Sequence, residues 1–66
     1  MASTPTITPT DSGYFADHTV MALVAIEARY AIESVDLYMS GNPELAEAAL
    51  DLSVAATREL LRRGIT

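Results

Sequence analysis

The stretch SGNPEL, Ser40 to Leu45, separates two predicted helices. Gly41 suits the left-handed residue that follows a helix, because glycine has no Cβ to clash in that conformation. Asn42 is a common N-cap residue, and Pro43 suits the first helical position, where no N–H donor is needed. Helices joined by so short a loop normally fold back on each other. The sequence therefore predicts an all-α fold, an antiparallel two-helix hairpin with helices at about 14–40 and 43–63.

The second predicted helix has one buried face and ends at Gly64. Glu59 and Arg63 are four residues apart, a spacing that allows an ion pair on the helix surface. At about 100° per residue, apolar side chains recur on one side of this helix while the charged ones occupy the other. The apolar stripe consists of Leu45, Ala49, Leu52, Ala56 and Leu60, flanked by Ala46, Leu50, Ser53, Thr57 and Leu61.

The first predicted helix is apolar over most of its circumference, with two separate stripes. Only a narrow strip, which includes Arg29, Glu33 and Asp36, is polar. A helix of this kind has to be covered on more than one side. One stripe consists of Met21, Val24, Ala25, Ala28, Ile32, Val35 and Met39, and the other of Leu23, Ile26, Tyr30 and Leu37.

A single hairpin covers only one of these stripes, which predicts self-association. An exposed stripe would form an apolar patch that small monomers rarely tolerate. A second copy is the commonest partner, and two hairpins make a four-helix bundle. We expect a homodimer, although the pattern does not decide which stripe faces the same chain. The residues assigned to self-association are Leu23, Ile26, Glu27, Tyr30, Ser34 and Leu37.

Glu27 interrupts the apolar run of the first helix, and three interpretations are open. It emerges at the edge of a groove and is solvated, or it accepts a hydrogen bond at the seam between hairpins, or it contacts another protein. An unpartnered carboxylate within the seam would be costly.

The chain divides into a predicted disordered arm, residues 1–13, and a hairpin domain, residues 14–66. Pro5 and Pro9 disfavour helix in the arm. Either Ser12 or Asp17 is expected to cap the first helix, with the helix established by His18. The preceding Tyr14 and Phe15 either fold back over the end of the bundle or contact a partner.

Composition disfavours several classes of function. The 66 residues include nine acids, four arginines, one histidine and no cysteine, for a net charge of −5. Thiolate metal sites and disulfides are excluded, and direct nucleic-acid binding, which needs a basic surface, is disfavoured. No catalytic motif is present, so we expect no enzyme activity, no cofactor and no metal. The apolar run is interrupted too early to span a bilayer, and we expect a cytoplasmic protein, of bacterial or phage origin.

The sequence thus favours a non-enzymatic protein–protein interaction module, a small adaptor, regulator or inhibitor that acts as a homodimer. Its partner would be a protein with a basic or mixed surface, contacted by Tyr14, Phe15, Glu33 or Asp36. Two alternatives are open. One is a small structural subunit of a heteromeric complex. The other is an acidic nucleic-acid mimic of the phage counter-defence type, with its charge on Glu33, Asp36, Glu44, Glu47 and Asp51.

Overall fold

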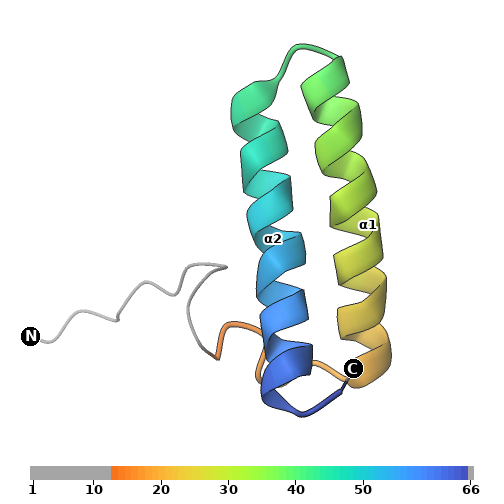
Figure 1. Cartoon of the computed structure of the whole chain (residues 1–66), viewed down its shortest axis with the longest axis vertical. Coiled ribbons are helices and arrows are strands. Elements are labelled where there is room, and N and C mark those ends of the chain that lie inside the picture. Colours follow the sequence, from red (N-terminus) through yellow and green to blue (C-terminus); the bar gives the residue numbers. More distant parts are fainter. Residues whose placement is uncertain (1–12, 66) are drawn as a thin grey trace, which may run out of the picture.

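Two antiparallel helices joined by a short loop make up the folded part of the chain (Figure 1). The computed structural model describes residues 13–65, so the predictions for residues 1–12 of the arm lie outside the described residues. Helix α1 spans Val20–Met39 and helix α2 spans Pro43–Arg62, and no strand occurs between residues 13 and 65. The predicted all-α hairpin is therefore confirmed, whereas its pairing into a four-helix bundle stays a prediction.

The loop between the helices has the backbone conformation that its residues predict. Gly41 has a φ of 85°, and a Cβ built there would meet no atom within 4 Å, so the conformation and not the space favours glycine. The Asn42 N–H donates to the carbonyl of Leu37 at 2.9 Å, closing the end of α1. Asn42 stands at the N-cap position, as expected, but its side chain makes no capping hydrogen bond. Pro43 begins α2.

The start of α1 differs from the prediction. The helix begins at Val20 and not near residue 14, and neither Asp17 nor His18 belongs to it. Its N-cap is Thr19, whose hydroxyl accepts a hydrogen bond from the Ala22 N–H at 3.1 Å. Residues 13–18 form turns instead, held by bonds such as that from the Ala16 N–H to the Gly13 carbonyl.

The core of the hairpin is small and lies toward its open end. Leu23 is the large side chain that is fully buried, and it clusters with Phe15, Ala56 and Leu60. The residues of α2 that meet α1 are mostly small, because Ala46, Ala49, Ser53 and Ala56 are all buried. Small side chains let two helices approach closely, but they bury little apolar surface in doing so.

A cluster of charged side chains fixes the C-terminal end of α2. The Glu59 carboxylate accepts hydrogen bonds from Arg62 Nε at 2.9 Å and from Arg63 Nε at 2.7 Å, which confirms the predicted pair with Arg63. These bonds lower the pKa of Glu59 from 4.5 to about 2. Arg63 Nη2 also donates to the carbonyls of Phe15 and Ala16, at 3.3 and 3.0 Å. The turn segment is thereby tied to α2.

A candidate interaction face on the hairpin

The structure decides which stripe of α1 lies against α2. Leu23 is fully buried in the core and Ile26 packs against it, while Glu27, Tyr30, Ser34 and Leu37 are half-buried. The stripe that the sequence assigned to a second chain thus lies between the two helices of one chain. The stripe left uncovered is the other one.

Glu27 has its hydrogen-bond partners within the same chain. Its carboxylate accepts a hydrogen bond from the hydroxyl of Thr57, and its backbone carbonyl accepts one from the hydroxyl of Ser53 at 2.9 Å. Both donors lie on α2. Of the three interpretations, the structure favours a seam hydrogen bond, but the seam is that of the hairpin and the donor is a threonine.

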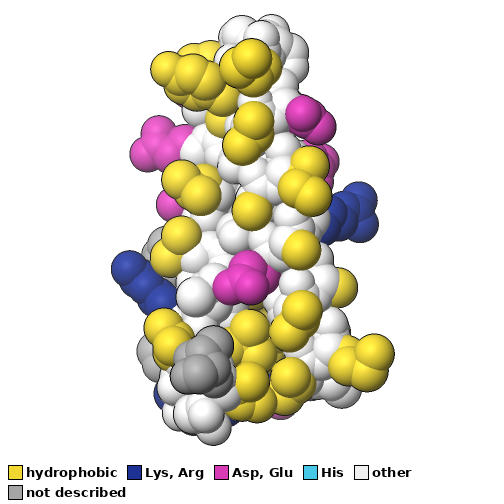
Figure 2. All heavy atoms as spheres, turned by 45° about the vertical axis from the view of Figure 1, so that its right-hand side comes forward, with side chains coloured by type: hydrophobic (Ala, Val, Ile, Leu, Met, Phe, Trp, Pro, Cys, Tyr) yellow, Lys and Arg dark blue, Asp and Glu magenta, His cyan; other side chains and the backbone are white. Residues whose placement is uncertain are grey.

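Large hydrophobic side chains are exposed along one side of both helices. On α1, positions 21, 24, 28, 32, 35 and 39 follow each other at three- and four-residue spacing and so share a side. On α2, positions 50, 54, 57 and 61 do the same. Figure 2 shows hydrophobic side chains over the length of the hairpin, with an acidic side chain among them. We call this surface the apolar face, and its exposed members are Met21, Val24, Ile32, Val35, Tyr38, Met39, Leu50 and Leu61.

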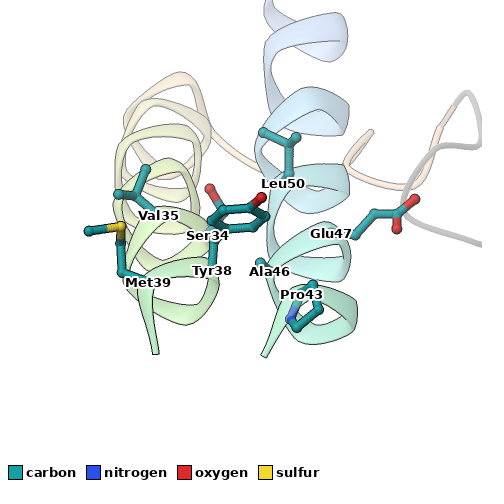
Figure 3. A pocket seen from close by; sticks show the side chains of 8 residues that line it. All are labelled: Ser34, Val35, Tyr38, Met39, Pro43, Ala46, Glu47 and Leu50. Atoms are coloured by element: carbon teal, nitrogen blue, oxygen red, sulfur yellow. The ribbon is translucent and has the colours of Figure 1, made fainter. Parts of the chain in front are cut away.

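The two helices contribute to the apolar face together, because a groove between them joins their side chains. It lies at the loop end, has a volume of about 430 Å³ and is open to solvent. In Figure 3, the Tyr38 ring lies between the helices and Leu50 lies on α2 beside it, whereas the Glu47 carboxylate points away at the outer edge of α2. The lining consists of Ser34, Val35, Tyr38 and Met39 from α1 and Pro43, Ala46, Glu47 and Leu50 from α2.

The four side chains predicted to contact a partner are dispersed. Glu33 and Asp36 are exposed on α1, outside the apolar face, and Glu33 lies 3.7 Å from Arg29 in an exposed ion pair. Phe15 is buried in the core, so its ring folds back over the open end, where Tyr14 packs against it edge to face at 4.7 Å. Tyr14 is 38 % exposed and the only one of the two rings at the surface.

Charge is distributed unevenly along the hairpin. Between residues 30 and 51, which form its loop end, the sequence has five acids and no basic residue. The other described residues, at the open end, include four arginines and three acids. The hairpin therefore has an acidic loop end, and the acids there are Glu33, Asp36, Glu44, Glu47 and Asp51.

Two further features of residues 13–65 bear on the chemistry that this surface offers. No group of three or more histidine, aspartate or glutamate side chains is placed to hold a metal ion. Neither α1 nor α2 has the combination of length and hydropathy that a membrane span requires. What the described chain presents is a broad apolar face with charged edges.

Comparison with protein-family models, with curated proteins and with solved structures found no significant match for the chain.

Proposed function

We propose that the protein is a non-enzymatic protein–protein interaction module that acts as a homodimer. Two hairpins pair through their apolar faces to give a four-helix bundle, and the outer surface of the bundle binds another protein. The proposed role is the adaptor, regulator or inhibitor that the sequence favours. The proposed self-association surface is different, because it uses the stripe of α1 that runs from Met21 to Met39 and not the one that contains Leu23.

The exposure of the apolar face carries the proposal. Met21, Val35 and Met39 are 84 %, 60 % and 80 % exposed, whereas the hairpin fully buries a single large side chain, Leu23. Burying one exposed side chain of this size is worth about 1.5–3 kcal/mol. A hairpin with so small a core gains stability when this face is covered, and a second copy supplies a face of the same shape.

The chemistry of the groove supports binding and not turnover. Its lining is largely apolar, and the carboxylate of Glu47 points out of it. The Glu59 carboxylate accepts three hydrogen bonds from Arg62 and Arg63, so most of its capacity to accept hydrogen bonds is used within the hairpin.

Molar mass in solution tests the dimer, with two variants that introduce the same charge. Val35→Glu places a carboxylate within the apolar face, and Ala48→Glu places one on an exposed side of α2 away from it. Light scattering should give twice the chain mass for the parent and for Ala48→Glu, and a smaller mass for Val35→Glu with its helicity retained. A monomeric parent protein at micromolar concentration would refute the proposal.

The partner surface is tested by reversing charge outside the apolar face. Because Glu33 and Asp36 are exposed on the polar side of α1, Glu33→Arg with Asp36→Arg should leave the dimer intact. The parent protein should recover a stoichiometric protein partner from its host, and the double variant should recover less of it. Equal recovery by both would remove these two residues from the partner surface.

The acidic loop end favours a second candidate, the nucleic-acid mimic. Five acids, of which Glu33 alone forms an ion pair with an arginine among the described residues, give one end of the hairpin a negative field, as a phosphate backbone does. A mimic should compete with DNA for a basic protein in a salt-sensitive manner, and charge reversal at Glu44 and Asp51 should abolish that competition. A partner whose binding is unaffected by DNA would speak for the adaptor or inhibitor instead.

A further inference from the structure

We infer that the two hairpins of the dimer pair in opposite directions, with their loops at opposite ends of the bundle and Glu47 of each chain beside Arg58 of the other. The inference rests on the proposed homodimer and adds its geometry. Two hairpins can also pair with both loops at one end, so the observations must distinguish these two arrangements.

The distribution of charge favours opposite directions. With both loops at one end, two acidic loop ends would lie side by side, each with five acids and no basic residue. With the loops at opposite ends, each acidic loop end lies beside the open end of the second copy, where the four arginines are. Screening at physiological salt limits such interactions to about 8 Å, so the side chains at the edge of the apolar face decide.

Three exposed charged side chains of α2 lie at that edge, Glu47, Asp51 and Arg58. Of these, Glu47 and Arg58 are opposite in charge and lie equally far from the middle of the helix. They are eleven residues apart on α2, which is three turns, so both side chains lie on the same side of the helix. Both are exposed, and Glu47 borders the groove with its carboxylate directed outward (Figure 3). If α2 packs antiparallel against α2 of the second copy about a twofold axis midway between them, each Glu47 meets an Arg58, and the pair occurs twice.

The shape of the apolar face leads to the same arrangement. The groove lies at the loop end, between Tyr38 and Leu50. At the open end, Met21 and Leu61 are exposed by 84 % and 56 %. In the reversed arrangement these two side chains lie over the groove of the second copy and fill it. In the other arrangement a groove would face a groove and stay empty, which costs packing.

Distance between the two loops tests the direction. The chain has no cysteine, so Asn42→Cys gives a single labelling site, and the Asn42 side chain makes no capping bond that would be lost. Two spin labels should lie about 30 Å apart or more if the loops are at opposite ends, because each helix is about 30 Å long. Labels within about 20 Å would place both loops at one end, since neighbouring helices are about 10 Å apart. That result would overturn the inference and leave the dimer standing.

Charge reversal tests the predicted ion pair. Glu47→Arg and Arg58→Glu should each weaken dimerisation about three- to tenfold, and the double variant should recover it. Glu33→Arg is the matched control for Glu47→Arg, because it makes the same change of charge at an exposed position on the polar side of α1, outside the apolar face. A double variant as weak as the single ones would overturn the pair. A monomeric parent protein by light scattering would refute the proposed function and this inference with it.

Discussion

The hydroxyl of Thr57 on α2 donates a hydrogen bond to the carboxylate of Glu27 on α1, thirty residues earlier in the chain. The same hydroxyl lies 3.1 Å from the carbonyl of Ser53, and the Ser53 hydroxyl donates to the backbone carbonyl of Glu27. These polar contacts fix the register between the helices near the middle of α2, where the buried residues Ala49, Ser53 and Ala56 are small.

Removing the Thr57 hydroxyl should therefore destabilise the hairpin through Glu27. Thr57→Val keeps the shape of the side chain but leaves the half-buried carboxylate without this donor. A hydrogen bond to a charged group is worth about 1.5–3 kcal/mol. A double-mutant cycle with Glu27→Ala, followed by urea unfolding at one fixed protein concentration, should give a coupling free energy in that range.

Ser53→Ala is the matched control for this cycle. Its hydroxyl also reaches Glu27, but at the backbone carbonyl, which Glu27→Ala does not remove. The coupling between Ser53→Ala and Glu27→Ala should be close to zero. Equal coupling in the two cycles would mean that the carboxylate does not depend on Thr57.

Local backbone chemistry made the hairpin predictable, because its strongest signals lie in adjacent residues. Gly41 and Pro43 fix the loop, and Glu59 and Arg63 are paired by helical spacing alone. The sequence places the start of α1 too early. Serine, aspartate and threonine are all common N-cap residue types, and the sequence does not decide between Ser12, Asp17 and Thr19. In the structure Thr19 is the N-cap, and Phe15 lies in the turn segment before the helix, from which its ring reaches the core.

The assignment of the two stripes of α1 could not come from periodicity. Both stripes are apolar, and the choice between them depends on which one complements Ala49, Ser53 and Ala56 of α2. Glu27 stands out in the sequence because it interrupts an apolar run. The residues that donate hydrogen bonds to it, Ser53 and Thr57, do not stand out, because they flank the apolar stripe of an amphipathic helix. The groove is a property of two helices together and has no signal in either one.

Phe15 and Tyr14 are adjacent aromatic residues with different burial, which predicts different effects on stability. Phe15 belongs to the core with Leu23 and Leu60, and Tyr14 is 38 % exposed. Truncating a buried phenylalanine to alanine costs about 3–5 kcal/mol, a large part of the stability of so small a domain. Phe15→Ala should lower the melting temperature strongly or abolish helicity by circular dichroism, and Tyr14→Ala should have a much smaller effect. Similar losses for both would contradict the burial of Phe15.

Arg63 and Arg62 both bind Glu59, but only Arg63 also contacts the turn segment before α1. Its Nη2 donates to the carbonyls of Phe15 and Ala16. Arg63→Ala should therefore speed amide hydrogen exchange within residues 14–19, because the turns lose their attachment to α2. Arg62→Ala is the control, since it removes a bond to Glu59 and leaves the turn segment attached. Faster exchange there in both variants would show that the segment is held through Glu59 and not directly by Arg63.

Glu59 should make the stability of the hairpin sensitive to acid. Hydrogen bonds from Arg62 and Arg63 hold its pKa at about 2, below the ordinary 4.5. The folded state therefore favours the carboxylate, and this contribution to stability is fully present above pH 4.5. It is lost as the pH falls from 4.5 toward 2, because the unfolded chain takes up the proton first.

Glu59→Gln isolates this effect from the other acids of the chain. Glutamine cannot ionise, so the variant should be less stable than the parent at neutral pH, and the difference in melting temperature should shrink between pH 4.5 and pH 2. Carbon-detected titration of the Glu59 carboxyl group gives the same pKa directly. A midpoint near 4.5, or a difference in melting temperature that does not change with pH, would mean that the two arginines do not bind the carboxylate in solution. Arg63 would then contact the turn segment without a bond to Glu59. Its hydrogen bond to the Phe15 carbonyl would be weaker, since Glu59 orients the guanidinium group that makes it.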